Sequence, residues 1–172
     1  MIPIVSIVGK SGSGKTTLIE KLIVELTRRG FRVATVKHNR HGFDIDHEGK
    51  DSWRHKHAGA VATVVASPGR VALIEDTPGD YNLAEIRERY IKDADVILAE
   101  GLKINPHPKI EIYRTELKRG LLCGSEDNLI ALAGDRPLPT AEVPCFDRDD
   151  AAGLADLIAE RFLKEAADDR DQ

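Results

Sequence analysis

One motif in the sequence has the residue types and spacing to bind phosphate. Gly9-Lys10-Ser11-Gly12-Ser13-Gly14-Lys15-Thr16 fits the P-loop pattern G-x-x-x-x-G-K-[ST]. Its glycines let the backbone curl so that successive N–H groups point at phosphate oxygens, and the following helix adds its positive N-terminal end. Lys15 would reach the β- and γ-phosphates, and the Thr16 hydroxyl would bind Mg²⁺. A flexible glycine turn is the alternative, but the apolar run before the motif and the helical pattern after it favour a nucleotide site.

A P-loop protein also needs a carboxylate that orients the magnesium ion, directly or through water. Glu100 directly follows the apolar run Val96–Ala99 and is the best candidate. Asp76 is a rival, although a hairpin before it would carry it to an edge of the sheet. Asp95, at the other end of the Glu100 strand, should point away from the phosphate and have a structural role.

Lys10 has two interpretations. In deviant Walker A proteins a lysine at this position reaches the nucleotide of a partner subunit, although those proteins usually have glycine where this chain has Ser11. The alternative is a solvated lysine of the loop.

Residues 37–52 form a polar segment, rich in His and Asp, that follows the second predicted strand. One interpretation is a transition-metal site, formed by His38, His41 and His47 with Asp44 and Asp46, but no pair has a compact helical ligand spacing. In the other interpretation, the cations and imidazoles bind an anionic ligand while a carboxylate coordinates magnesium. The cations are Lys37, Arg40 and Lys50, and the carboxylates are Asp44, Asp46 and Asp51. The charge of the segment favours an anion-binding site over a dedicated metal site. A mobile polar loop is the third possibility.

The elements that must position these residues predict an α/β fold of the P-loop type, with three layers and a mainly parallel central sheet. An apolar strand over 2–8, the glycine loop, an amphipathic helix ending near Gly30 and a strand over 31–36 make a βαβ unit. A hairpin is expected over 61–75, at one edge of the sheet. Asn82 and Glu85 resemble a capping box that starts a helix. Further strands are expected over 96–99, 110–113 and 129–133, with a last helix from Asp149 or Asp150.

Length and composition limit the class of protein. The 172 residues are expected to form one domain, with a short charged tail at about 166–172. A net charge of −4 gives no positive electrostatic field that would attract nucleic acid non-specifically. No apolar run approaches the ~18 residues that span a bilayer. Without a visible signal peptide or a disulfide framework, the chain is expected to be cytoplasmic and reduced.

Four segments together resemble the molybdopterin-guanine dinucleotide biosynthesis adaptor (MobB) family. They are GKSGSGKTTL, TVKHNRHGFDIDHEGKDSWRHKHAGA, VILAEGLK and PKIEIYR, and the resemblance covers roughly residues 2–114. It implies a P-loop protein that binds GTP with Mg²⁺, hydrolyses it slowly at most, and forms homodimers. Such a protein assists the guanylyltransferase that joins GMP to molybdopterin, and the pterin or the molybdenum cofactor is a further candidate ligand.

The resemblance also assigns residues. Gly12, Gly14, Lys15, Thr16 and Thr17 would cradle the phosphates and magnesium, with Glu100 in the Walker B position. The segment that would face the nucleotide, the pterin phosphate or both contains His38, His41, Asp44, Asp46 and Lys50. Lys103 and Lys109 would neutralise an anionic ligand. Lys15, Asp44 and Glu100 are the residues expected to act in catalysis.

The chain has no N-K-x-D motif for guanine recognition. Asp135 follows the run Ala131–Gly134, where a carboxylate could accept hydrogen bonds from N1 and N2 of the base. An ordinary turn aspartate is an equal alternative.

Two other functions compete with the GTP-binding accessory protein. A small-molecule kinase using ATP also begins with a P-loop, but needs a lid with cations, for which Arg114, Lys118 and Arg119 are candidates. A non-enzymatic adaptor would use nucleotide only to set its shape and partner affinity. Turnover separates them, because a kinase transfers phosphate at ~1–100 per second.

Overall fold

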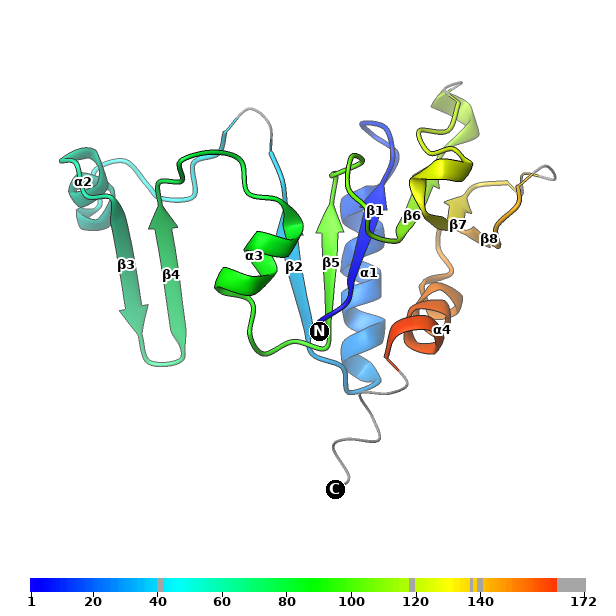
Figure 1. Ribbon diagram of the computed structural model, residues 1–172, viewed down its shortest axis with the longest axis horizontal. Coiled ribbons are helices and arrows are strands. Elements are labelled where there is room, and N and C mark those ends of the chain that lie inside the picture. The colour runs from blue at the N-terminus through cyan, green and yellow to red at the C-terminus, as the bar shows by residue number, and fades with distance from the viewer. Residues whose placement is uncertain (40–41, 118–119, 137, 139–140, 164–172) are drawn as a thin grey trace. The chain divides into compact units, whose positions relative to one another are not determined.

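The computed structural model describes residues 1–39, 42–117, 120–136, 138 and 141–163, and the chain forms two compact units (Figure 1). The first unit combines Met1–His38 with the chain from Asn82 onward, and the second is Asn39–Tyr81. One domain over residues 1–172 stays a prediction, because compactness alone does not define an independently folding domain. The phosphate motif lies wholly in the first unit.

A six-stranded parallel sheet forms the centre of the first unit. The strand order is β2-β5-β1-β6-β7-β8, and every neighbouring pair is parallel. The strands are β1 Ile4–Val8, β2 Val33–Lys37, β5 Val96–Glu100, β6 Lys109–Tyr113, β7 Leu129–Gly134 and β8 Cys145–Asp147. Their carboxyl ends therefore lie along one edge, where ligands bind in open α/β sheets. The predicted fold class is confirmed.

Helices cover both faces of this sheet. On one face, α1 (Lys15–Arg28) and α4 (Ala151–Phe162) bury Leu22 and Ile158 against strand residues such as Ile7. On the other face, α3 (Leu83–Tyr90) packs Leu83 against Ile97. The predicted capping box of α3 is present, because the Asn82 side chain accepts from the N–H groups of Ala84 and Glu85 and the Glu85 side chain accepts from the Asn82 N–H.

Strand β6 carries two buried charged residues where it lacks a covering helix. Lys109 and Glu111 alternate with apolar residues along the strand, and each is 1% exposed. The Lys109 ammonium donates to the backbone oxygens of Asn105 (2.6 Å), His107 (3.1 Å) and Asp127 (2.8 Å). The Glu111 carboxylate accepts from the N–H groups of Leu122 and Cys123. These bonds fix the irregular chain around the 3₁₀ turns η1 (Thr115–Leu117) and η2 (Ser125–Asp127) over this face.

The second unit contains the short helix α2 (Asp51–His57) and the antiparallel hairpin β3 (Ala62–Ser67) and β4 (Arg70–Glu75). The hairpin is present as predicted, but it forms a two-stranded sheet of its own rather than an edge of the central sheet. Across residues 42–81 the only buried side chain is Thr63. In the described part of the chain, no helix is long and apolar enough to cross a membrane.

Candidate functional site

The phosphate motif forms the turn between β1 and α1. Gly9, Gly12 and Gly14 have φ values of 153°, 79° and 104°, conformations that residues with a Cβ rarely adopt. Strand β6 packs directly against this loop, since a Cβ atom at Gly9 would lie 2.4 Å from the Ile112 carbonyl oxygen. The loop therefore requires glycine at Gly9 both for its conformation and for this close approach.

Lys15 begins α1 and reaches back over the loop. Its Nζ donates to the carbonyl oxygens of Gly9 at 2.9 Å and Lys10 at 3.2 Å. The ammonium charge is thus held at the loop, where the motif requires it. Lys10 itself contributes backbone to this arrangement, and its role towards a partner subunit stays a prediction.

Thr16 and Glu100 meet although they are far apart in the sequence. The Thr16 hydroxyl donates to Glu100 Oε1 at 3.0 Å, and the Lys37 ammonium lies 3.7 Å from Glu100 Oε2. Glu100 ends β5, the neighbour of β1, so the parallel sheet brings its carboxylate to the loop. A hydroxyl and a carboxylate side by side are hard oxygen ligands, and this donor set suits Mg²⁺.

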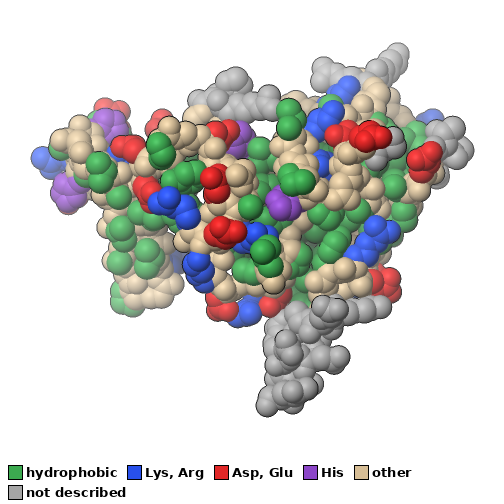
Figure 2. Space-filling view, in the orientation of Figure 1, with side chains coloured by type: hydrophobic (Ala, Val, Ile, Leu, Met, Phe, Trp, Pro, Cys, Tyr) green, Lys and Arg blue, Asp and Glu red, His purple; other side chains and the backbone are tan. Residues whose placement is uncertain are grey.

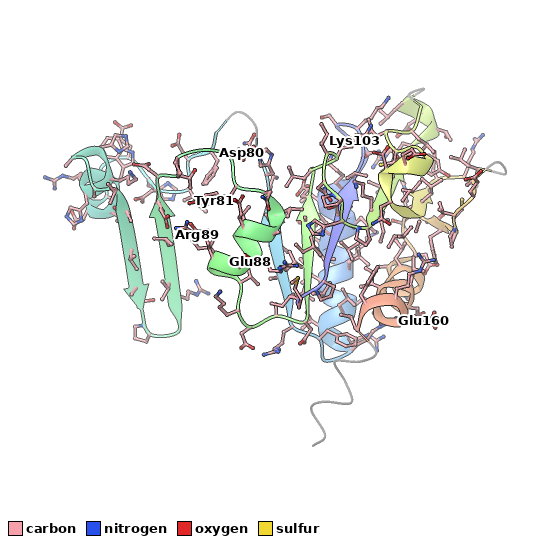
Figure 3. All side chains as sticks on the ribbon, in the orientation of Figure 1. Asp80, Tyr81, Glu88, Arg89, Lys103 and Glu160 are labelled. Carbon is pink, nitrogen blue, oxygen red and sulfur yellow. The ribbon has the colours of Figure 1, made fainter. Side chains whose placement is uncertain are left out.

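His38 and Lys103 come from neighbouring loops at the same edge of the sheet. The His38 N–H donates to the Glu100 carbonyl oxygen at 3.4 Å. Lys103 lies on the loop that follows β5, at the end of the sheet where β1 and β5 finish (Figure 3).

Asp95, at the opposite end of β5, is buried and accepts from the Arg32 N–H and guanidinium, which supports the structural role expected for it.

Asp44, Asp46 and Lys50 belong to the second unit, so their role at the phosphate loop stays a prediction. Asp44 and Lys50 are exposed, and Asp46 accepts from the His47 N–H through Oδ1. Asp46 Oδ2 is buried without a hydrogen-bond partner among the described residues. His41, with Arg40, lies outside the described residues. Asp76, the rival of Glu100, forms an ion pair with Lys56.

Helix α2 presents cations and imidazoles at the surface of the second unit (Figure 2). The rings of Trp53 and His57 stack with their centroids 3.6 Å apart. They line an open hollow together with Arg54 and His55. No group of three or more potential metal-ligating side chains gathers among the residues that the structure describes.

Asp135 follows β7 at the carboxyl edge of the sheet. Its carboxylate accepts from the Thr115 N–H at 3.0 Å and the Thr115 hydroxyl at 2.7 Å, and these bonds lower the pKa of Asp135. The residue lines a hollow of about 130 Å³ between the ends of β7 and β8, with Phe146 and Arg136 beside it. The carboxylate is therefore ionised and oriented, and Asp135 shares this hollow with an aromatic residue.

The structure corrects one expectation and adds residues that the sequence did not indicate. Lys109, expected at an anionic ligand, is buried with its three donors bound to carbonyl oxygens. Phe146 lies in β8 and Arg148 in the turn after it, both at the carboxyl edge of the sheet. The sequence did not indicate them, because β8 is too short to show a periodic pattern. Arg114, considered only as a lid residue of a kinase, lies beside the phosphate loop.

Comparison with known proteins gives one consistent family. The family model described as "Molybdopterin guanine dinucleotide synthesis protein B" (MobB) matches residues 4–135. The molybdopterin-guanine dinucleotide biosynthesis adapter protein of Haemophilus influenzae is 41% identical over 138 residues, which are 80% of this chain and 77% of the relative. The protein of the same name from Escherichia coli is 38% identical over 169 residues, or 96% of each chain.

A solved structure agrees with these relatives. The crystal structure of Bacillus subtilis MobB matches with a TM-score of 0.77 and 30% identity, covering 95% of this chain and 99% of that one. The similarity therefore continues beyond residue 114, where the sequence motifs ended. None of these relatives is named as a kinase, so they support the accessory function and not the kinase alternative.

Proposed function

The chain belongs to the molybdopterin guanine dinucleotide synthesis protein B family, and from this premise we propose that it binds GTP with Mg²⁺ as an accessory protein of molybdopterin-guanine dinucleotide biosynthesis. It would assist the guanylyltransferase that attaches GMP to molybdopterin. Its relatives carry the name of adapter proteins of this biosynthesis, which supports the assignment.

The hydrogen bond between Thr16 and Glu100 is the observation that carries the nucleotide site. It joins the hydroxyl at the end of the phosphate motif to the carboxylate at the end of the neighbouring strand. Thr16 and Glu100 would hold Mg²⁺ there, and the bound ion would neutralise charge on the β- and γ-phosphates. The backbone N–H groups from Gly12 to Thr17 would bind the phosphate oxygens.

Hydrolysis by this protein would be slow at most. Lys15 would stabilise charge on the phosphates, and Asp44 and Glu100 are the carboxylates proposed to act with it. His38, Lys50 and Lys103 would supply further positive or hydrogen-bonding groups to the nucleotide or the pterin phosphate. Nucleotide binding would then set the affinity for the guanylyltransferase more than drive a reaction of its own.

Guanine would be read by Asp135. The two hydrogen bonds from Thr115 keep its carboxylate ionised and oriented at the edge of the hollow beside Phe146. An ionised carboxylate accepts from both N1 and N2 of guanine, whereas adenine offers no donor at N1. Asp135→Ala should therefore reduce the preference for GTP over ATP.

The protein would act as a homodimer in the cytoplasm, with the hairpin of the second unit as the surface that pairs two copies. The supporting observation is that the described part of this unit buries no hydrophobic side chain of its own.

The test is calorimetric titration of the purified protein with GTP and with ATP, each with Mg²⁺. We expect tighter binding of GTP, and loss of all nucleotide binding in Lys15→Ala with an unchanged circular dichroism spectrum. A preference for ATP would contradict the proposal and favour the kinase. Unchanged affinity in Lys15→Ala would remove the phosphate assignment itself.

A further inference from the structure

Arg114 is the first residue after β6, and its guanidinium lies beside the phosphate loop. Its Nη2 atom is 3.8 Å from the position that a Cβ atom would take at Gly14. The Nη1 atom donates to Glu116 Oε1 at 3.1 Å, while the buried Nε atom has no hydrogen-bond partner among the described residues. A guanidinium has five N–H donors in a rigid fork, so Arg114 has donors to spare at the loop.

The strand order explains how this side chain reaches the loop. Strand β1 lies between β5 and β6 in the parallel sheet, and the loop follows β1. Glu100 ends β5 on one flank of the loop, and Arg114 follows β6 on the other. The carboxylate proposed for magnesium and the guanidinium therefore approach the same loop from opposite sides.

The flank occupied by Arg114 is hollowed and carries positive charge. A hollow of about 160 Å³ is lined there by Gly14, Thr17, Arg114, Arg148 and Asp149, among others. The single carboxylate of this set, Asp149, is already bound to the Lys21 ammonium at 2.6 Å, and its Oδ2 lies 3.9 Å from Arg148 Nε. Two guanidiniums beside a neutralised carboxylate suit an anionic group of the ligand.

We propose that Arg114 binds the non-bridging oxygens of the α- and β-phosphates of the nucleotide, from the flank opposite the magnesium site. This inference rests on the proposed nucleotide binding and deepens it. The backbone of a P-loop cradles the α- and β-phosphates, whereas magnesium bridges the β- and γ-phosphates. Because Arg114 shares its hollow with Gly14 and Thr17 and not with Glu100, its phosphate partners are the α and β groups.

Glu116 competes with the nucleotide for this guanidinium. The Glu116 carboxylate is 67% exposed and accepts from Nη1. Phosphate oxygens are carboxylate-like acceptors for an arginine fork, so a bound diphosphate exchanges with Glu116. The Arg114–Glu116 ion pair thus holds the guanidinium near the loop before nucleotide binds.

The first test measures the Kd of GTP and of GDP, each with Mg²⁺, for Arg114→Gln and Arg114→Lys. A charge-assisted hydrogen bond lost to Gln corresponds to about 10- to 100-fold weaker binding, and we expect the same factor for both nucleotides. Arg114→Lys keeps the charge without the fork and should lose less. Arg28→Gln is the matched control, because this exposed arginine lies at the other end of α1, about 20 Å from the loop.

The second test is a double-mutant cycle with Glu116→Gln. Removing the competing carboxylate should tighten GTP and GDP several-fold in the otherwise unchanged protein. The same substitution should have no effect in the Arg114→Gln background. Circular dichroism spectra check that each variant is folded, and Glu116→Gln tests the idea without removing the arginine.

The outcomes separate this inference from the function on which it rests. Nucleotide binding that survives Arg114→Gln unchanged overturns the role of Arg114 and leaves the proposed function intact. A loss confined to GTP would place the guanidinium at the γ-phosphate and would overturn the assignment made here. Failure of the unchanged protein to bind either nucleotide overturns the proposed function, and this inference with it.

Discussion

At the scale of single residues, Glu100 is held by two partners at the loop. Its Oε1 accepts from the Thr16 hydroxyl and its Oε2 faces the Lys37 ammonium. The protein therefore already positions this carboxylate, which would lower the cost of ordering it around the proposed magnesium ion. Thr16 and Glu100 should consequently act as one unit in magnesium binding.

This coupling predicts how magnesium affects nucleotide affinity. In the unchanged protein, Mg²⁺ should tighten GTP binding, and Thr16→Ala or Glu100→Gln should remove about 10- to 100-fold of that gain. The double variant should lose little more than either single variant, because each disrupts the same site. Titrations with Mg²⁺ and with EDTA give the measurement, with Glu20→Gln, an exposed residue of α1, as control. Additive losses would show that the two residues act separately.

Glu25 predicts an acid-sensitive contribution to stability. Hydrogen bonds from the Arg28 side chain, and then from Arg29, lower the pKa of Glu25 from 4.5 to about 2. Because the folded pKa is the lower one, this stabilisation is complete above pH 4.5 and is lost as the pH falls towards 2. Glu25→Gln should therefore be less stable than the unchanged protein at pH 5, and the difference should shrink as the pH falls from 4.5 through about 2. Denaturant unfolding over this pH range measures this, and a difference that does not shrink would contradict it.

At the scale of elements, local patterns predicted the parts of the fold that a few neighbouring residues determine. The buried run before Gly9, the amphipathic α1 and the capping box at Asn82 each depend on contacts within one element. The Glu100 position was also predictable, because a carboxylate directly after an apolar strand must stand at its carboxyl end. These features predicted the fold class, which is confirmed, and they placed the phosphate loop beside Glu100, whose role in magnesium binding stays a prediction.

Features that depend on distant partners were not predictable in this way. Strand β8 has three residues, Cys145–Asp147, too few to show a period, and it is defined by pairing with β7. Arg114 lies beside the phosphate loop, and Asp135 beside Thr115, only because of the strand order. Lys109 has the residue type of a ligand-binding cation. Only the course of the surrounding loop shows that its ammonium binds backbone oxygens of the protein itself.

Lys109 provides a test of how β6 and its covering loop hold together. Burial lowers the pKa of Lys109. Its ammonium donates hydrogen bonds to three backbone oxygens, which need a donor from within the folded protein. Lys109→Met leaves these acceptors without their donor, so we expect a loss of at least about 3 kcal/mol in the free energy of unfolding. Lys103→Met, a half-buried lysine of the neighbouring loop, is the control and should cost less than about 1 kcal/mol. A loss below about 1 kcal/mol in Lys109→Met would show that water replaces the ammonium.

At the scale of the whole molecule, the two units differ in how they bury apolar surface. The first unit encloses cores on both faces of its sheet. In the second unit, the β3–β4 register places Val64 opposite Leu73 and Ala66 opposite Val71, so the four side chains share one face of the hairpin. Hydrophobic side chains are visible over this hairpin in Figure 2, and Val64, Val71 and Leu73 are 61%, 73% and 43% exposed.

An apolar face of this kind on a two-stranded sheet predicts a partner. An isolated hairpin is marginally stable in water, and its outer edges offer unpaired backbone groups. A second copy of the chain would cover the face and extend the sheet, in agreement with the homodimer that we propose. The alternative occupant, the guanylyltransferase, would leave the purified chain monomeric.

The oligomeric state of the purified protein decides between these occupants. Light scattering coupled to size exclusion should give twice the chain mass of 18.9 kDa for the unchanged protein. Val64→Glu places a charge in the centre of the shared apolar face and should give the monomer mass, because a buried unpaired carboxylate opposes association. Ser67→Glu adds the same charge to the opposite face of the hairpin and should leave the dimer intact. A monomeric unchanged protein would favour the guanylyltransferase as the occupant of the apolar face. A Val64→Glu variant that still dimerises would show that the two copies pair through another surface. The phosphate loop and Glu100 lie in the first unit and the hairpin lies in the second. A monomeric Val64→Glu variant that still binds GTP would therefore also show that dimerisation and nucleotide binding are separable.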